Sequence, residues 1–431
     1  MRRILAIVLA LSAVAAGART WTLEECVDYA VEHNIDVLSR RIEAGQSENE
    51  VTAAKDAFLP QVSAYGSQSF NFGRGLTADN TYANRNTTST SFGAQLNLPI
   101  FQGLGAVRRL DYSRTALKAS LQQVEAAKDD VTLNVIAQYL QALYASEMTQ
   151  VARINLAIST AELRRRGLLI EEGRLPELDI HEARAQVAND ELGLTNALND
   201  SITAVLDLAQ LLNLPSADDF ELAPLADDDS LLPDPGTVFA NALSFNHSIL
   251  AQQYNAEAAG KNVAVVKSGY LPTLNFSAGL GTNYYRTSGF DNETFSQQMR
   301  HNFAKSIGFS LNVPIFDAFN TRNSVRRARA QEATARLQLD DARNRLYKAI
   351  VQAHTQAVAA AKKAVSADVA VESNKAAFDA MQIKIDNGRA TATEYETSKQ
   401  NYMSALAQAV QAKYERILRA RILNFYNSAE M

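Results

Sequence analysis

The sequence carries one short phrase twice, and this duplication constrains the fold more than any other feature. Residues 91–101 read SFGAQLNLPIF and residues 306–316 read SIGFSLNVPIF, so that seven of the eleven positions are identical. The stretch Ala30–Pro60 likewise aligns with Ala242–Pro272. Self-similarity in the same order over such spans indicates two copies of one structural plan.

The two copies divide the chain into repeats. We expect the first repeat to span residues 19–213 and the second to span residues 237–431, with a linker over residues 214–236 that contains four prolines and an acidic run. Residues 1–18 combine a basic start, a short apolar run and an Ala-x-Ala cleavage pattern, which predicts a signal peptide. The alternative is an anchoring helix, but the apolar run is too short to span a bilayer.

Proline and glycine are scarce, with 9 and 19 copies among 431 residues, which favours long uninterrupted helices. Each repeat predicts a helix of about 35 residues, a β-hairpin, one helix of about 70 residues and a further helix of about 37. A capping box, Thr22 to Glu25, opens the first repeat, and the pair Asp234-Pro235 opens the second. The two shorter helices together match the long one, so they can stack end to end beside it.

Four stretches alternate apolar with small polar residues, which predicts strands with two unlike faces. The apolar positions are Val62, Ala64, Gly66, Phe70 and Phe72; Phe92, Ala94, Leu96 and Leu98; Leu274, Phe276, Ala278 and Leu280; and Ile307, Phe309, Leu311 and Val313. Loops rich in Asn, Thr and Gly, roughly residues 73–88 and 286–303, join them into two hairpins. Each hairpin is expected to end at Pro99 or Pro314, where the helical period returns.

Four strands with one apolar face leave two options. The face packs on the helices of the same chain, or it meets lipid in a membrane barrel. The second is favoured because each following helix runs away from its strand, and because no mature segment is apolar enough for a spanning helix. Four strands cannot close a barrel, whose smallest membrane forms have about eight. The predicted fold is therefore mainly α with β: a long antiparallel α-helical barrel plus four strands per chain, contributing to a trimeric 12-stranded membrane β-barrel.

Composition and motifs exclude other classes. Cleavage after residue 18 removes two arginines and leaves a net charge near −7, which argues against a nucleic-acid partner. Cys26 is the only cysteine, so no disulfide framework exists and a packed core thiol is expected. The histidines are scattered, and no metal-binding, nucleotide-binding or nucleophile motif occurs. We expect no enzyme activity, no cofactor and no metal. His181 and Glu182 stand near Asp179, but we expect no catalytic role for them.

The chain resembles the TolC family of outer-membrane efflux proteins. The resemblance covers nearly the whole mature chain, through the opening WTLEECVDYAVEHN, a Leu-Pro before each hairpin, both SxGxxLNxPIF segments and two Gly-Arg turns. It implies a homotrimer whose β-barrel lies in the outer membrane of a Gram-negative bacterium and whose helical tunnel extends into the periplasm. It also implies passive export, with energy supplied by an inner-membrane pump of RND or ABC type through a periplasmic adaptor.

The Gly-Arg turns are the candidate functional sites. By resemblance, the turns contact the adaptor through Gly173, Arg174 and Leu175 in the first repeat and Gly388, Arg389 and Ala390 in the second. Acidic positions just past the turns would form rings at the periplasmic aperture: Asp179, Glu182 and Glu394. A simpler hypothesis is that Asp179 and Glu394 cap the helices that follow, and the two roles are compatible. The nearby run Arg164–Arg166 is interpreted as a solvated helix face, with salt bridges to a neighbour's acidic tip as the alternative.

The sequence leaves the cargo, the adaptor and the pump open. The rival interpretation is a periplasmic coiled-coil scaffold or adhesin without a pore. Four alternating strands distinguish the two, because a scaffold has no use for them.

Overall fold

The computed structural model describes residues 19–76, 80–214, 220–225 and 232–428. The predicted signal peptide, residues 1–18, lies outside them, as does part of the predicted linker. The chain forms two compact units. The helical unit comprises Met1–Arg41, Val124–His247 and Arg343–Met431, and the sheet unit comprises Ile42–Gln123 and Ser248–Ala342. Each unit draws on both predicted repeats, whose boundaries stay a prediction.

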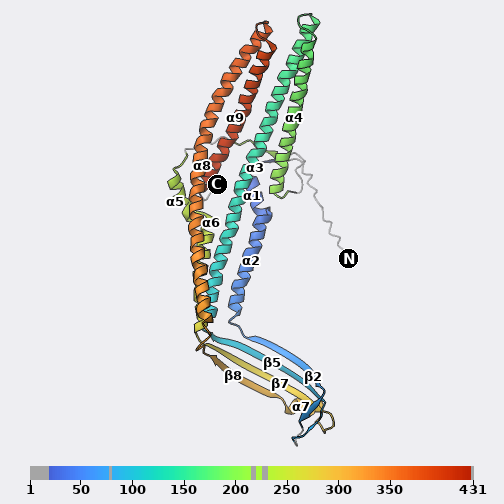
Figure 1. Cartoon of the computed structure of the whole chain (residues 1–431), viewed down its shortest axis with the longest axis vertical. Helices are drawn as coiled ribbons and strands as arrows, with labels where there is room; N and C mark the ends of the chain where they lie inside the picture. The colour runs from blue at the N-terminus through green and yellow to red at the C-terminus, as the bar shows by residue number, and fades with distance from the viewer. Residues whose placement is uncertain (1–18, 77–79, 215–219, 226–231, 429–431) are drawn as a thin grey trace, which may run out of the picture. The chain divides into compact units, whose positions relative to one another are not determined.

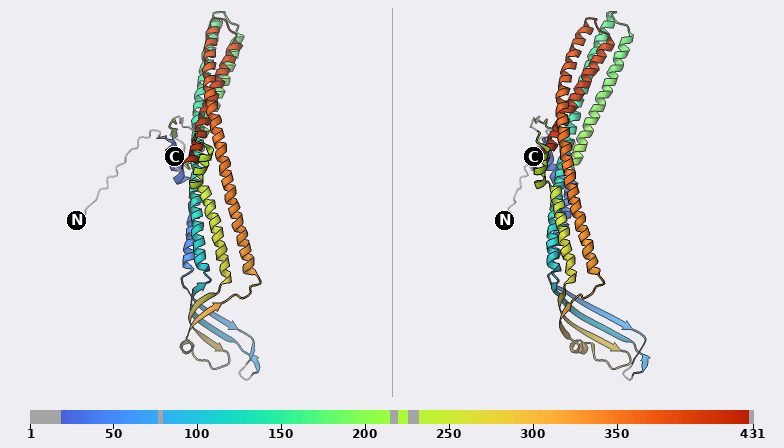
Figure 2. Two further views of the ribbon diagram at one scale, coloured as in Figure 1. Left: turned by 90° about the vertical axis from the view of Figure 1, so that its left-hand side faces the viewer. Right: turned by 60° about the vertical axis from the view of Figure 1, so that its left-hand side comes forward.

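The long helices have about the expected lengths. α3, Gly105–Glu171, and α8, Asn320–Asp386, span 67 residues each. α4, Leu178–Leu211, has 34 residues and α9, Ala392–Asn427, has 36. In the helical unit α3 and α4 lie side by side as one helical hairpin, and α8 and α9 form another (Figures 1 and 2). Among the described residues, every helix is either too short or too polar to cross a lipid bilayer.

The helix before each β-hairpin is interrupted, whereas the sequence predicts one continuous helix of about 35 residues. The first repeat has α1, Leu23–His33, and α2, Ile35–Asp56; the second has α5, Pro235–Phe245, and α6, His247–Lys267. Both predicted helix starts are confirmed. Thr22 and Glu25 form a reciprocal capping box, and the Asp234 carboxylate accepts from the backbone of Gly236 and Thr237.

An asparagine makes the interruption in both repeats. Asn34 and Asn246 are extended residues, with ψ of 134° and 113°, and each donates its backbone N–H to the carbonyl four residues earlier. The side-chain oxygen of Asn34 accepts from the backbone N–H of Asp36 at 2.9 Å, as an N-cap does. One residue therefore ends one helix and starts the next. The two asparagines occupy matching positions in the aligned stretches, so the break belongs to the repeated plan.

The four predicted strands form one antiparallel sheet in the order β2-β5-β7-β8 (Figure 1). Their bounds are Gln61–Asn71 for β2, Thr87–Gln102 for β5, Thr273–Thr287 for β7 and Ala304–Asn312 for β8. The register brings the apolar positions together across the sheet, with Val62 opposite Leu96, Leu96 opposite Ala278 and Ala278 opposite Ile307. The central pair β5–β7 joins the two repeats.

The apolar face of the sheet is exposed in the single chain. Val62 is 72% accessible and Ile307 is 75% accessible, and Phe309 and Leu311 are exposed as well. The first option from the sequence, burial of this face against the chain's own helices, is therefore wrong. The outer strands β2 and β8 each have only one strand neighbour, so among the described strands the sheet has two open edges.

The connections contain more structure than predicted. Within the first expected loop, Arg74–Leu76 (β3) pairs with Tyr82–Asn84 (β4), and within the second, Phe295–His301 forms helix α7. Thr294 and Gln297 build a capping box for α7, a short signal inside an otherwise loop-like stretch. Strand β5 also passes through Pro99 instead of ending there. The pairing with β2 stops at Asn97, and a register shift in the pairing with β7 follows Pro99, so the proline lies where the ladder is already irregular.

The apolar core of the helical unit lies around α1. Cys26, Val135, Tyr139, Leu208 and other buried side chains pack there. The predicted core thiol is confirmed, and burial raises the pKa of Cys26 to about 12. Beside it, Arg19–Trp21 (β1) pairs in parallel with Phe220–Leu222 (β6). The Tyr139 hydroxyl lies 3.0 Å from the Trp21 carbonyl and 2.7 Å from that of Ala223, so it bridges these strands.

The strand-to-helix turn is left-handed in both repeats. Gly103 and Leu104 have φ of 58° and 63° before α3, and Ala318 and Phe319 have φ of 54° and 63° before α8. These pairs stand 215 positions apart, as the duplicated phrases do. A side chain at Gly103 would place its Cβ 2.8 Å from the Ser268 carbonyl oxygen, so only glycine fits there.

We predict that Gly103→Ala destabilises the protein by more than about 1–2 kcal/mol, the typical penalty for a left-handed residue with a side chain, because the Ser268 carbonyl must also move. Urea or heat denaturation followed by circular dichroism measures the change. Gly193→Ala is the matched control, since nothing lies within 4 Å of its added Cβ. It should be neutral or stabilising by about 1 kcal/mol, the usual gain inside a helix. Equal stability of both variants would contradict this account of the turn.

Candidate functional site

The two Gly-Arg turns have the same backbone geometry. Gly173 has φ of 70° and Gly388 has φ of 66°. The N–H of Arg174 donates to the Leu169 carbonyl at 2.8 Å, and the N–H of Arg389 donates to the Lys384 carbonyl at 2.9 Å. Together with the bond of each glycine N–H to the carbonyl three residues earlier, this is a Schellman ending. The repeated dipeptide therefore builds one turn twice.

The helices after the turns begin differently. Glu394 forms a capping box with Thr391: its carboxylate accepts from the Thr391 N–H at 2.7 Å, and its own N–H donates to the Thr391 hydroxyl at 3.2 Å. The backbone and side-chain hydrogen bonds from Thr391 lower the pKa of Glu394. α4 has no such cap, because Glu177 stands at its start and makes no capping bond. The capping hypothesis is thus correct for Glu394, whereas Asp179 only lies in the first turn of α4.

The predicted aperture residues lie on the two hairpins, as expected from their positions in the chain. Asp179 is half-buried, and Glu182, one turn further along α4, is exposed, as is Glu394. Within the described residues no hydrogen bond or ion pair joins the three carboxylates to one another. The predicted adaptor contacts, Gly173-Arg174-Leu175 and Gly388-Arg389-Ala390, form the tips themselves.

A charge cluster behind the tips joins the two hairpins. Glu162 of α3 accepts from the guanidinium groups of Arg165 and Arg166 at 2.7 Å. Arg165 also lies 4.0 Å from Asp386 at the end of α8, and Arg166 lies 3.6 Å from Glu396 of α9. Arg166 is buried. The interpretation of this basic run as a solvated face is therefore wrong for Arg165 and Arg166, which form salt bridges within the chain.

The cluster shifts the pKa values of its two glutamates in opposite directions. Burial would raise the pKa of Glu162, but the hydrogen bonds and charges of Arg165 and Arg166 outweigh it, so the pKa of Glu162 is lowered. Burial raises the pKa of Glu396, and the charges of Lys399 and Arg166 offset this only in part. Glu162 is thus the firmly ionised member that holds the two arginines.

Further from the tips, a buried ion pair ties the two repeats together. Lys399 of α9 lies 2.9 Å from a carboxylate oxygen of Asp190 in α4, and the two residues are 2% and 7% accessible. Ser159 of α3 donates to Asp190 and accepts from Lys399. Asn155 and Gln186 donate to the other oxygen of Asp190, at 2.9 and 3.0 Å. Three helices therefore meet around one neutralised carboxylate.

The sequence interpretation missed this ion pair, although a signal exists. Tyr395, Lys399 and Met403 recur every four residues on the buried side of α9, so a lysine interrupts an otherwise apolar stripe. Asp190 stands seven residues after the buried Ala183 in α4. A charged residue on a buried stripe predicts a partner on a neighbouring helix, but the sequence does not say which helix supplies it.

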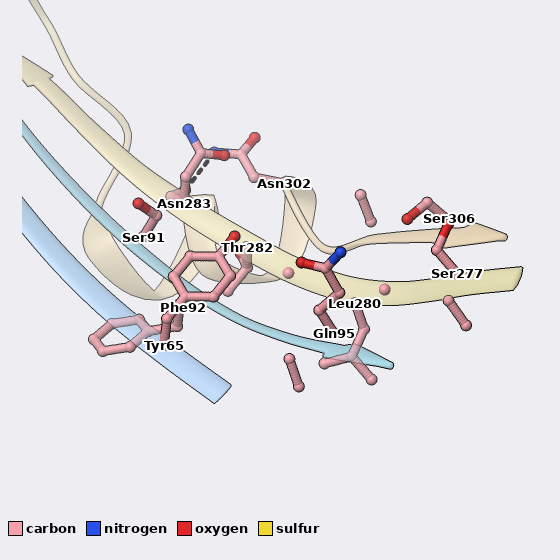
Figure 3. A pocket seen from close by; sticks show the side chains of 15 residues that line it. Tyr65, Ser91, Phe92, Gln95, Ser277, Leu280, Thr282, Asn283, Asn302 and Ser306 are labelled. Carbon is pink, nitrogen blue, oxygen red and sulfur yellow. Dashed lines mark hydrogen bonds between the residues drawn. The ribbon is translucent and has the colours of Figure 1, made fainter. Parts of the chain in front are cut away.

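The wall of the sheet unit is chemically plain. Residues from all four strands line a cavity of about 450 Å³, with Ser91, Gln95, Ser277 and Ser306 among them (Figure 3). Tyr65 lies near Phe92 in this view, and its ring covers Gly93 on the neighbouring strand. None of the lining residues is charged. The wall therefore offers neutral hydrogen-bonding groups to whatever passes along it.

Comparison with known proteins agrees with this architecture. The family model described as outer membrane efflux protein matches residues 27–214 and 238–424. The outer membrane efflux protein BepC of Brucella suis is 24% identical over 400 residues, which cover 93% of this chain and 83% of that protein. The outer membrane protein TolC of Vibrio cholerae is 24% identical over 426 residues, which cover 97% and 93%. The crystal structure of the Campylobacter jejuni CmeC outer membrane channel superposes with a TM-score of 0.79 at 17% identity, covering 94% of this chain and 85% of that one.

Paired helical hairpins and an open four-stranded sheet are the architecture of an outer-membrane channel subunit. The chain belongs to the outer membrane efflux protein family, which matches it over both repeats. It is an outer-membrane exit duct of the TolC type.

We predict that Lys399→Met lowers stability by about 3 kcal/mol or more, because it leaves the Asp190 carboxylate buried without its counter-charge. The double variant Lys399→Met/Asp190→Leu should recover most of this loss, since an apolar pair of similar volume replaces the ions. Urea denaturation is measured for the wild type, for Lys399→Met, for Asp190→Leu and for the double variant. The four free energies of unfolding give the coupling energy between Lys399 and Asp190.

Lys413→Met is the matched control. Lys413 also lies on α9 and pairs with Glu147 of α3 at 3.0 Å, but both side chains are partly exposed. Its removal should change stability by less than about 1 kcal/mol. If Lys399→Met and Lys413→Met behave alike, the buried pair does not hold the hairpins together.

Proposed function

We propose that three copies of this chain assemble into one duct that runs from the periplasm to the cell exterior. The observation that carries this proposal is the open sheet: four strands with an exposed apolar face and with open outer edges on β2 and β8. The strands have 9 to 16 residues, and tilted membrane strands need about 9–11. Pairing β8 of one copy with β2 of the next gives a closed barrel of twelve strands.

The helical hairpins would then surround the periplasmic entrance. Threefold symmetry turns Asp179, Glu182 and Glu394 into rings of carboxylates around the narrowest part of the tunnel. Rings of acidic side chains attract cations and repel anions. The hydrogen bonds from Thr391 lower the pKa of Glu394, which favours the charged form of its ring. The second repeat has Thr397 where Glu182 stands in the first, so a second acidic layer comes from one repeat only.

We infer that partner proteins supply the energy for export, because the described lining of the sheet unit holds only neutral side chains. We assign the tips, Gly173-Arg174-Leu175 and Gly388-Arg389-Ala390, as the contact surface for a periplasmic adaptor that links the duct to an inner-membrane pump of RND or ABC type. Family membership supports this arrangement. The Schellman turns expose Gly173, Arg174, Gly388 and Arg389 at the ends of the two hairpins, with Leu175 and Ala390 half-buried beside them, which suits docking.

The assembly is tested by measuring the mass of the purified protein in mild detergent with light scattering. We expect three times the mass of the mature chain, and discrete conducting steps when the same preparation is added to a planar lipid bilayer. A pore-less scaffold or adhesin would give no steps. A monomer or dimer that never forms larger rings would remove the basis of the barrel.

We predict that Asp179→Ala/Glu394→Ala raises single-channel conductance, because six bulky charged side chains leave the aperture of the trimer. Asp179→Asn/Glu394→Gln should instead lower cation selectivity at nearly constant size, and the amide oxygen that replaces the Glu394 carboxylate can still accept the capping bond from Thr391. Glu191→Ala/Asp207→Ala, on exposed positions of α4 away from the turn, is the control. If the control shifts selectivity as much as the Asn/Gln pair does, the aperture does not lie at these residues.

A further inference from the structure

A basic groove lies in the sheet unit where the strands give way to the helices. Arg108 of α3, Lys267 of α6 and three arginines of α8, Arg322, Arg326 and Arg329, line a cavity of about 700 Å³. The remaining lining residues are uncharged, so the described groove contains no acidic side chain. This concentration of positive charge stands out in a chain whose net charge is −5.

Helix periodicity brings the three arginines of α8 to one face. They stand at positions 322, 326 and 329, a spacing of four and three that repeats about once per turn. Val325 and Ala328 flank this face, are buried and pack with Val263 of α6, and Val325 also lines the groove. The packing of α8 on α6 therefore fixes the direction in which the arginines point.

Most of this charge is uncompensated. Within the described residues, the side chains of Arg326, Arg329 and Lys267 make no hydrogen bond or ion pair. Arg108 donates to the Ala264 carbonyl at 3.0 Å and to the Ser268 hydroxyl at 3.2 Å, both neutral acceptors. Arg322 lies over the ring of Phe319, 5.4 Å from its centroid. Like charges gathered around one cavity repel each other, and a bound anion would relieve the repulsion.

The surroundings of the groove indicate the kind of anion. Leu271 of its lining lies two residues before β7, and α3 begins three residues after β5 ends. The segment between β8 and α8 contains Ile315, which is 95% accessible, and the exposed Phe316 and Phe319. Basic residues beside exposed aromatic and aliphatic side chains, at the end of a set of membrane strands, are typical of the bilayer interface.

We propose that this groove binds the phosphate headgroup of an anionic phospholipid, in the leaflet that lies next to the helices. The inference rests on the proposed function, because it takes the sheet as the part that enters the membrane. Guanidinium groups match phosphate oxygens in pairs of hydrogen bonds, and the groove offers two free ones, Arg326 and Arg329. Such a lipid would hold each copy at a set depth in the outer membrane.

The test uses the intact protein in mild detergent, titrated with phosphatidylglycerol or with phosphatidylcholine of the same acyl chains and analysed by native mass spectrometry. The wild type should prefer phosphatidylglycerol, and raising the salt concentration should weaken the preference. Arg326→Gln/Arg329→Gln should bind it roughly 30-fold more weakly, since each basic residue contributes roughly fivefold. Both positions are exposed, and circular dichroism confirms folding.

Arg327→Gln/Arg336→Gln is the matched control, because it removes two charges from the same helix outside the groove. Arg327 donates to the Ser324 hydroxyl and Arg336 pairs with Glu332. This variant should bind phosphatidylglycerol within about twofold of the wild type. An equal loss in both variants would mean diffuse attraction to the whole basic surface and would overturn the assignment of the groove.

Three further outcomes would also overturn it. Unchanged lipid binding in Arg326→Gln/Arg329→Gln excludes the groove as the site. Retention of inorganic phosphate in place of lipid, lost in the same variant, makes it a site for a soluble anion. If Arg326→Gln/Arg329→Gln changes the ratio of anion to cation permeability in bilayers but still retains lipid, the two arginines lie in the pore. The mass and conductance of the wild-type protein test the proposed function separately. The proposed function fails only if no conducting trimer forms, whatever the result of the lipid titration.

Discussion

The open edges of the sheet are the constraint on which the rest of this molecule depends. A strand without a neighbour leaves backbone N–H and C=O groups unpaired, and inside a bilayer no water is present to satisfy them. β2 and β8 have this problem on their outer sides, while the face formed by Val62, Ile307 and Phe309 offers apolar side chains to solvent. The proposed trimer would relieve both: further copies of the chain would close the sheet, and lipid would cover its apolar face. As a segment of that cylinder, the single chain would need no core between its own strands.

The helical unit solves a different problem, since long parallel hairpins can slide past one another. Near α1 an apolar core around Cys26 and Tyr139 prevents this. Towards the tips the contacts become polar and specific: Arg165 and Arg166 connect α3 with the ends of α8 and α9, and Lys399 meets Asp190 across the two repeats. Buried ion pairs add little net stability over apolar packing, but a displaced partner leaves a bare charge, so they select one register. Ion pairs therefore align the helices near the tips, whereas apolar packing aligns them in the middle of the helical unit.

Much of the fold could be predicted from the chain alone, because the decisive signals are local or duplicated. The strand pattern, the capping box at Thr22, the N-cap at Asp234 and the Gly-Arg turns each depend on a few neighbouring residues. Other local signals were present and were overridden or overlooked. Asn34 and Asn246 resemble ordinary helix residues in the sequence although they stop their helices, and Pro99 resembles a strand end although β5 continues past it through a register shift. Of the candidate site, the positions of Asp179 and Glu394 past the turns were predicted, but not the cluster that supports the tips.

By itself the sequence determined the two-repeat plan, the class of each element, the two-faced strands and the family, since all of these follow from periodicity and from repetition along the chain. Only the tertiary structure decided which helix faces which. Lys399 and Asp190 are 209 positions apart and belong to different repeats, so no local pattern could pair them. The same holds for the basic groove, where Arg108, Lys267 and Arg326 come from three helices and meet only because Val325 and Ala328 bury against α6. Electrostatic contacts depend on the distance between side chains in space, whereas the sequence gives only their separation along the chain.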